Sequence, residues 1–347
     1  MDFAFSAEQE QLRSATRDYL ADRYPIERVV AIADSDSGHD PSAWRELAEL
    51  GWLDPDLEVL DHAVLAEETA AALLPAPWWS TVGLSWPLLD DELRDGVAAG
   101  ERSVTVAWAE PGGPADLAGA AASSATTADR NGKLGGVKVY VPDLGAVTDV
   151  IVTCADGLYA VDVAAHQQTV ITRSTMDRTR RLGELRLERT PGRRLDVSLE
   201  SLTGVRRRAL ALLACESVGV GQHALDLAAD YAKNRQQFGR VIGTYQAVSH
   251  RIANTYVAVQ LARSMAYWAA WAVGVADPDA EVAVAGASVS AGDGAVFACE
   301  QAIQAHGGIG FTWEHPLHRV YKRAQWNNAF EGTSRVHRAT IADHLLA

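Results

Sequence analysis

The first hundred residues show the spacing of apolar and polar positions that is typical of helices. Ser6 is followed three residues later by Gln9, the spacing of a capping box, so a helix is expected to begin there and run towards Arg23. Apolar residues recur at helical spacing in three further stretches, which are Trp44–Leu50, Ala63–Leu73 and Leu88–Ala98. The chain up to about residue 100 is therefore predicted to form a helical domain.

Between residues 101 and 202 the pattern changes to short runs rich in Val, Thr and Tyr that Gly, Pro or Asp separate. The runs predicted as strands are Ser103–Trp108, Gly136–Val141, Asp149–Thr153, Gly157–Val163 and Thr169–Ile171. No helical pattern lies between them, which favours a small barrel or sandwich over a parallel nucleotide-binding sheet. The Ala-, Ser- and Thr-rich stretch Ala118–Thr127 is expected to be a loop.

Long helical patterns return after Gly204. They cover Arg206–Asn234, Thr244–Val273, Pro278–His306 and, at the end of the chain, Ser334–Leu346. The second and third are rich in Ala, Gly and Ser, which lets helix axes approach closely, as in an antiparallel four-helix bundle. The predicted fold class is α+β and mainly α: an N-terminal helical domain (1–100), a middle β barrel or sandwich (101–202) and a C-terminal helical bundle (203–347).

Composition narrows the class of protein. The 347 residues carry a formal net charge of −14, which argues against nucleic-acid binding and against a polybasic membrane anchor. The N-terminus lacks the basic-then-apolar pattern of a signal peptide, and no run approaches the roughly 18 uninterrupted apolar residues of a membrane span. A soluble, cytoplasmic protein is expected.

Its three cysteines are too few for a disulfide framework and are interpreted as reduced packing residues: Cys154, Cys215 and Cys299.

A first candidate motif runs from Arg235 through Phe238 and Gly239, with Gln246 opening the next predicted helix. An arginine at a helix end can pair with a pyrophosphate, a phenylalanine can cover an aromatic ring, and a glycine permits a tight turn. An ordinary helix C-terminus would also account for these residue types.

A second candidate motif is the glycine-rich segment that begins at Gln304 and contains Gly307 and Gly308. A predicted helix precedes the glycines, whereas a Rossmann dinucleotide-binding loop follows a strand, so a Rossmann loop is not expected here. The glycines are expected to end the helix and expose backbone N–H groups to a phosphate or an adenine, although a plain helix cap would look the same. Nearby histidines do not form a metal motif, because the turn contains a proline and no carboxylate pair: His306, His315 and His318.

A third candidate motif is Phe330-Glu331-Gly332-Thr333-Ser334-Arg335. Glu331 is the candidate site residue of this motif. The alternative is a simple turn in which Thr333 or Ser334 caps the last helix.

These three motifs, in this order and at these separations, resemble the signatures of the acyl-CoA dehydrogenase family. The opening Phe5–Gln9 segment resembles the family's first helix, and Leu74–Pro77 resembles a short actinobacterial branch that degrades steroid side chains. The resemblance implies an FAD enzyme that converts an acyl-CoA thioester to a trans-2-enoyl-CoA. It assigns α-proton removal to Glu331 and hydride acceptance to flavin N5. It implies FAD contacts at Arg235, Phe238, Gln246, Gln304, Gly307, Gly308, Thr333 and Arg335.

The resemblance also implies partners. Electron-transfer flavoprotein is the expected electron acceptor, and the expected assembly is a homodimer, a homotetramer or an α2β2 heterotetramer in which neighbouring chains share FAD sites. Some relatives carry the base on the first bundle helix, where this chain has Ala209, which leaves Glu331 as the candidate.

Three departures from the family pattern affect the details of the site. The arginine–aspartate pair that usually follows the glycine loop reads Lys322-Arg323, and the helix start at Arg206–Arg208 lacks the usual acidic pattern. The flavin-contacting stretch reads Ala109–Asp116 without the usual threonine, and the later hydroxyl contact is replaced in Tyr140-Val141-Pro142. Two alternatives stay open. The same fold hosts oxygen-using flavoproteins, and the short chain resembles actinobacterial dehydrogenases built from two different chains, in which it could be an FAD-sharing partner subunit.

Overall fold

The computed structural model describes residues 4–346, which divide into two compact units. The first unit combines the chain up to Val29, the segment Glu58–Leu74 and the chain from Leu210 onwards. The second combines Val30–Leu57 with Pro75–Ala209. The division into three consecutive domains stays a prediction, because these units are defined by packing and each takes in part of the N-terminal helical region.

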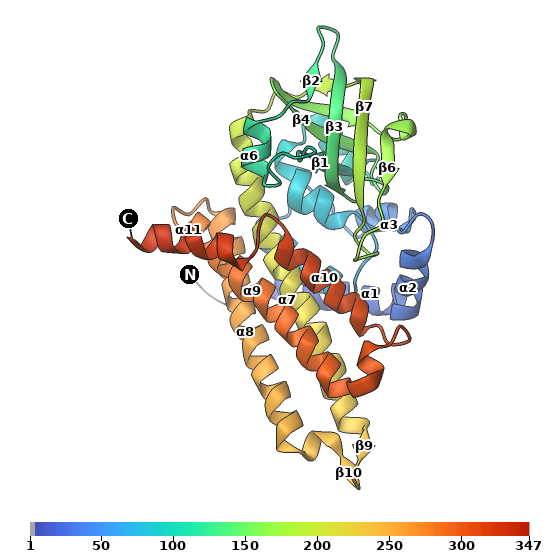
Figure 1. Cartoon of the computed structure of the whole chain (residues 1–347), viewed down its shortest axis with the longest axis vertical. Coiled ribbons are helices and arrows are strands. Elements are labelled where there is room, and N and C mark those ends of the chain that lie inside the picture. Colours follow the sequence, from blue (N-terminus) through green and yellow to red (C-terminus); the bar gives the residue numbers. More distant parts are fainter. Residues whose placement is uncertain (1–3, 347) are drawn as a thin grey trace. The chain divides into compact units, whose positions relative to one another are not determined.

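The first unit is built from helices (Figure 1). They are α1 (Ala7–Arg23), α4 (Val59–Ala71), α7 (Leu202–Asn234, from Leu210 on), α8 (Gln246–Gly274), α9 (Ala280–His306), α10 (Leu317–Ala329) and α11 (Ser334–Leu346). The capping box at the start of α1 is confirmed: Gln9 N donates to Ser6 Oγ and Ser6 N donates to Gln9 Oε1, both at 3.2 Å.

Small residues set the helix spacing in this unit. A Cβ added at Gly219 of α7 would lie 1.9 Å from the carbonyl oxygen of Glu67 in α4, so only glycine allows this approach. A Cβ at Gly292 of α9 would lie 2.5 Å from Asn328 Oδ1 of α10. The close packing expected from the Ala- and Gly-rich helices is therefore present.

The segment Ala280–Phe311, which contains α9, is long and apolar enough by composition to cross a membrane, but half of its most apolar window is buried inside the protein. A core helix of a bundle in water has the same properties. Its charged residues Glu281, Asp293 and Glu300 interrupt the apolar run, in line with the sequence reading.

The second unit holds two four-stranded sheets. One has the order β1-β4-β5-β8 and the other the order β2-β3-β7-β6. Their strands are β1 (Val104–Ala107), β2 (Thr127–Ala128), β3 (Lys133–Pro142), β4 (Asp149–Cys154), β5 (Gly157–Asp162), β6 (Val170–Thr172), β7 (Leu182–Pro191) and β8 (Arg193–Arg194). β1 and β4 pair in parallel and the other pairs are antiparallel. One buried cluster joins Val150 and Val152 of the first sheet to Leu185 and Leu187 of the second, which is the packing of a sandwich.

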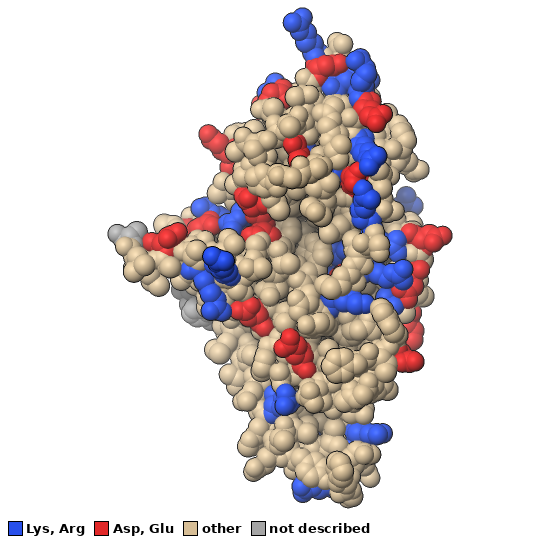
Figure 2. Space-filling model, in the orientation of Figure 1, with Lys and Arg blue, Asp and Glu red and all other residues tan. Residues whose placement is uncertain are grey.

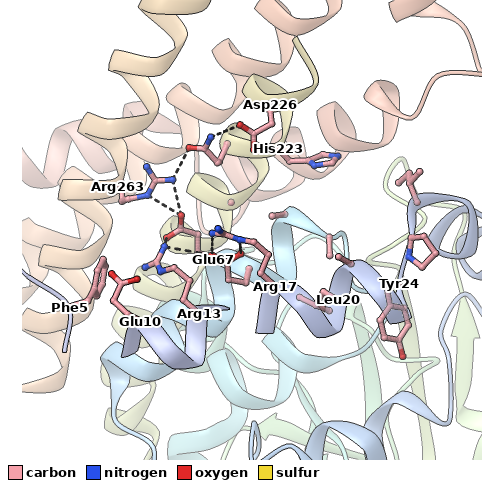
Figure 3. Close-up of a pocket in the computed structure, with 18 residues that line it drawn as sticks. Phe5, Glu10, Arg13, Arg17, Leu20, Tyr24, Glu67, His223, Asp226 and Arg263 are labelled. Atoms are coloured by element: carbon pink, nitrogen blue, oxygen red, sulfur yellow. Dashed lines mark hydrogen bonds and ion pairs between the residues drawn. The ribbon is translucent and has the colours of Figure 1, made fainter. Parts of the chain in front are cut away.

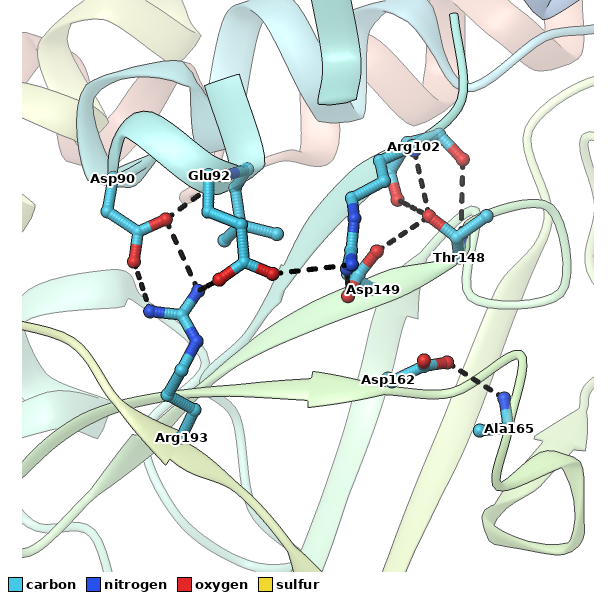
Figure 4. Close-up of polar contacts among 10 residues, drawn as sticks. Asp90, Glu92, Arg102, Thr148, Asp149, Asp162, Ala165 and Arg193 are labelled. Atoms are coloured by element: carbon cyan, nitrogen blue, oxygen red, sulfur yellow. Dashed lines mark hydrogen bonds and ion pairs between the residues drawn. The ribbon is translucent and has the colours of Figure 1, made fainter. Parts of the chain in front are cut away.

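Helices and short turns accompany the sheets. They are α2 (Ile26–Asp34, from Val30 on), α3 (Ala43–Glu49), a π-helical turn (Trp79–Ser85), α5 (Asp91–Ala98) and α6 (Leu117–Ala122). A charged network ties α5 to the sheet (Figure 4): Arg193 pairs with Asp90 and Glu92, and Arg102 donates to Asp149 at 2.9 Å. Burial, as the largest cause, raises the pKa of Asp149.

Three sequence expectations were wrong or incomplete. The expected loop at Ala118–Thr127 begins as the helix α6, because Asp116 accepts a hydrogen bond from Gly119 N at 2.7 Å and caps it. The strand β7 was missed, since its outward positions are Glu and Arg and interrupt the apolar run. The helix α10 was missed because its apolar positions are few and its other positions are charged or amide-bearing.

Candidate active site and cofactor contacts

Glu331 lies in the short connection between α10 and α11. It is 9% exposed and has a φ of +57°, the left-handed region that residues other than glycine seldom adopt. Such a conformation costs on the order of 1–3 kcal/mol and persists only where the surroundings hold it. Phe330 stacks on Trp326, with ring centroids 5.5 Å apart, and Gly332 follows with a φ of +110°. A buried carboxylate is therefore presented from a constrained turn.

Contacts from α9 hold the far end of this turn. Ser334 Oγ donates to Asp293 Oδ1 at 2.5 Å, and Arg338 donates to Asp293 Oδ2 at 3.0 Å. Asp293 thus binds α11 at its first residue and again one turn further along. Contacts from α7 hold the near end, since Asn327 Nδ2 donates to Ser217 Oγ at 3.3 Å.

A cavity of about 10 Å³ lies next to Phe330, between Ser217, Asn327 and His337. Asn327 is buried, and its Oδ1 has no hydrogen-bond partner among residues 4–346. A polar cavity of this size is at the lower limit for one water molecule, which would satisfy that oxygen.

The first candidate cofactor motif forms the end of α7 and a small hairpin. β9 (Gln236–Gln237) pairs with β10 (Arg240–Val241), and Phe238 and Gly239 make the turn with φ values of +53° and +84°. Phe238 is 91% exposed, so its ring is free to cover another surface. Arg235 and Gln246 are also exposed.

The glycine-rich motif ends α9 as the sequence predicts. Gly307 has a φ of +64°, and a Cβ at Gly307 or Gly308 would meet no atom within 4 Å. The backbone here is open to a ligand, and Gln304 on the preceding turn is exposed. This exposed glycine backbone is what close approach of a phosphate or adenine group requires.

A stacked ring pair brings the two cofactor motifs to one end of the bundle. Tyr231, in the last turns of α7, stacks on His306 at the end of α9, with centroids 4.3 Å apart. His306 is buried, and burial, as the larger cause, lowers its pKa while its bond to the Ala302 carbonyl opposes the shift. Its ring packs between those of Tyr231 and His315, the latter with centroids 4.5 Å away.

Glu331 lies away from that end of the bundle. Asp293, which binds the start of α11, precedes His306 by thirteen residues on α9. At 1.5 Å per residue this is about 20 Å along the helix. Thr333 and Arg335 are exposed beside Glu331. The predicted site residues therefore form two groups on this chain: Glu331, Thr333 and Arg335 in one, and Arg235, Phe238, Gln246, Gln304, Gly307 and Gly308 in the other.

In the second unit, Lys138 and Glu110 were not singled out from the sequence. Lys138 is 0% exposed, and its ammonium donates to Glu110 at 2.7 Å, Thr153 Oγ1 at 3.0 Å and the Trp108 carbonyl at 3.1 Å. Burial would raise the pKa of Glu110, but the bond from Lys138 and further bonds from Thr126 Oγ1, the Ala125 N–H and Ser124 lower it to about 2. A lysine between apolar residues of a strand is the signal that could have revealed this pair.

The Lys138–Glu110 pair holds the start of the stretch Ala109–Asp116 in place. This stretch is the one that resembles a flavin-contacting segment of the acyl-CoA dehydrogenase pattern. Two residues beyond Lys138, Tyr140 has a φ of +58° and is 65% exposed. Its ring is presented at the surface of the sandwich.

Comparison with known proteins identifies the family. The model of the acyl-CoA dehydrogenase C-terminal domain matches residues 204–346. The chain is 31% identical over 327 residues to acyl-CoA dehydrogenase IpdE2 of Mycobacterium tuberculosis, covering 91% of each chain. It is 33% identical to acyl-CoA dehydrogenase FadE34 of the same organism over 79% of this chain and 36% of that protein.

Solved structures agree. A steroid acyl-CoA dehydrogenase, the Tcur3481-Tcur3483 G363A variant, superposes with a TM-score of 0.83 at 27% identity, over 98% of each chain. Butyryl-CoA dehydrogenase from Megasphaera elsdenii has a TM-score of 0.86 at 21% identity over both complete chains, which shows the fold. The protein belongs to the acyl-CoA dehydrogenase family and is an enzyme of that class, as its sequence motifs indicated.

Proposed function

We propose that the protein dehydrogenates an acyl-CoA thioester to a trans-2-enoyl-CoA, with FAD as cofactor and Glu331 as general base. The observation that carries the proposal is the buried Glu331 carboxylate, held in a left-handed turn by residues of α7, α9 and α10. A general base must be held in a fixed position, because it can take a proton only when it lies within hydrogen-bond distance of that proton.

The chain's own groups supply the proton chemistry. Glu331 takes the α-proton, and a backbone N–H near Glu331 donates to the thioester carbonyl, where negative charge develops. Burial of Glu331 and the Phe330–Trp326 stack limit water at this point. FAD, when bound, supplies the hydride acceptor.

The residues present suit FAD. The open backbone at Gly307 and Gly308 and the uncovered Phe238 ring are features that a flavin dinucleotide would use. We assign its contacts to Arg235, Phe238, Gln246, Gln304, Gly307, Gly308, Thr333 and Arg335.

The separation of about 20 Å between the two groups along α9 supports an FAD site completed by a second chain. Much of the surface over α8 and α9 is uncharged in Figure 2. Apolar side chains are exposed on these two helices: Tyr256, Val257 and Leu261 on α8 and Phe297 on α9. We propose a cytoplasmic homodimer, homotetramer or α2β2 assembly that passes electrons to electron-transfer flavoprotein.

A second candidate is an FAD-sharing partner subunit. The same separation favours it, as does the likeness to a chain of the ChsE4-ChsE5 complex from Mycobacterium tuberculosis, at 21% identity and a TM-score of 0.84. In that case the chain contributes the glycine-rich loop to a neighbour's flavin.

The test is an anaerobic titration of the purified flavoprotein with a panel of acyl-CoA esters, following the absorption band of oxidised flavin. Glu331→Gln should slow bleaching by about 10²- to 10⁴-fold, and the control Glu300→Gln, an exposed glutamate of α9, should leave it unchanged. A protein that responds only after a second, different chain is added would support the partner-subunit candidate. Bleaching at an equal rate in Glu331→Gln would refute the assignment of the base.

A further inference from the structure

A groove of about 870 Å³ lies within the first unit (Figure 3), and neither Glu331 nor its turn is among the lining residues. One wall is α1 and the other is α7, α4 lies between them, and Arg263 of α8 lies at one end. Small-molecule sites usually occupy about 300–1,000 Å³. The groove has the size of a ligand site.

The end near Phe5 is lined by charges that neutralise one another. Glu67 accepts from Arg13 at 3.3 Å and from Arg263 at 2.8 Å, and Arg17 binds Glu68 through two bonds of 2.8 and 3.0 Å. These ion pairs join α1, α4 and α8, so they hold the walls in place. They leave no strong excess of either sign to select an ionic ligand.

The other end is mainly apolar and carries His223. Most of its lining is apolar, from Leu20, the Tyr24 ring, Ile26 and Ala72. Figure 3 shows His223 on the α7 side of this end, with the Asp226 carboxylate one helical turn further along. Within the part of the chain that the structure describes, the His223 ring makes no hydrogen bond. Burial, as the larger cause, lowers the pKa of His223, so the imidazole is neutral at pH 7 and can either donate or accept one hydrogen bond.

We propose that this groove is a second ligand site, which takes an uncharged, mainly apolar molecule whose single hydroxyl or carbonyl oxygen bonds to His223. The apolar end supplies the burial that drives binding, and His223 supplies the one directional contact. The paired charges at the far end disfavour an ionic ligand, because an added charge would have to displace an existing partner. The proposal goes beyond the dehydrogenation reaction and does not depend on Glu331.

The test uses 2-naphthol and naphthalene as probes of the flavin-containing protein, with binding measured by equilibrium dialysis. The wild type should bind 2-naphthol roughly three- to tenfold more tightly than naphthalene, the worth of one hydrogen bond. In His223→Phe that preference should vanish while naphthalene still binds.

Paired variants locate the probe. Ala21 lines the groove on α1, and Ala15 is exposed on the same helix but does not line it. Ala21→Trp should weaken both probes at least tenfold, and Ala15→Trp should leave them unchanged. Equal binding by Ala21→Trp and wild type, an unchanged preference in His223→Phe, or loss of binding in Glu331→Gln would each overturn the proposal. Flavin bleaching by acyl-CoA should persist in Ala21→Trp, which separates this test from that of the proposed function.

Discussion

Replacing Lys138 with methionine tests whether the sandwich depends on its buried ion pair. The ammonium is fully buried, and four oxygens surround it: Glu110 Oε1, the Trp108 carbonyl, Ser124 Oγ and Thr153 Oγ1. Methionine has a similar length, so the substitution removes the charge and its hydrogen bonds without opening a large cavity.

The expected loss is near the lower end of the range for a broken buried pair, about 3 kcal/mol. Glu110 is left without its cation, but donors from Ser124, the Ala125 N–H and Thr126 remain and limit the loss. The assay is urea unfolding at pH 7 followed by tryptophan fluorescence. Lys133→Met is the matched control, because Lys133 lies on the same strand and its side chain makes no ion pair in the described residues; we expect a change within about 0.5 kcal/mol.

The dependence of stability on pH tests the same ion pair of Lys138 and Glu110. The pKa of Glu110 is lowered from its ordinary 4.5 to about 2, so its contribution to stability is present above pH 4.5 and is lost as the pH falls towards 2. That contribution is about 3 kcal/mol in the wild type and should be smaller in Lys138→Met. An unfolding free energy of Lys138→Met within 1 kcal/mol of the Lys133→Met value would refute this reasoning.

Three further predictions concern the first unit and the thiols. Gly219→Ala should destabilise the protein by more than about 3 kcal/mol, because the added Cβ would overlap a carbonyl oxygen of α4. Gly221→Ala is the control, since its added Cβ would meet its nearest atom at 3.4 Å and should cost far less stability. Thermal unfolding of the two variants compares these costs. Asp293→Asn should slow flavin bleaching by roughly tenfold at saturating acyl-CoA and leave the substrate affinity unchanged, because it loosens the turn that positions Glu331. A variant that is slower and also binds the substrate more weakly would indicate general misfolding instead. The thiols should not react with Ellman's reagent at pH 8 until the protein is denatured, and rapid labelling of the native protein would contradict the buried positions of Cys154, Cys215 and Cys299.

Local features of this protein could be read from its sequence. The capping box of Ser6 and Gln9 involves groups three residues apart, and the predicted hydrogen bonds are present. The glycine-rich end of α9 was recognisable because Gly307 follows the last helical residue and takes a positive φ of +64°, which favours glycine. Glu331 could be singled out by its motif, although its role as base stays a proposal.

Long-range features could not be read in the same way. The left-handed turn at Glu331 is held by Asp293, some forty residues earlier, and nothing in the neighbouring sequence indicates that partner. The sequence around Lys138 suggests a buried lysine but not its partner, because Glu110 lies 28 residues earlier and only folding brings it beside the ammonium.

The sequence by itself determined the helix and strand periodicity, the helix ends and the family motifs, because each depends on residues within a few positions of one another. Only the tertiary structure decided which charges are buried together, how closely α4 approaches α7 at Gly219, and where His223 lies in the groove. These depend on packing between segments far apart in the chain, whose contacts form only when the hydrophobic core brings them together.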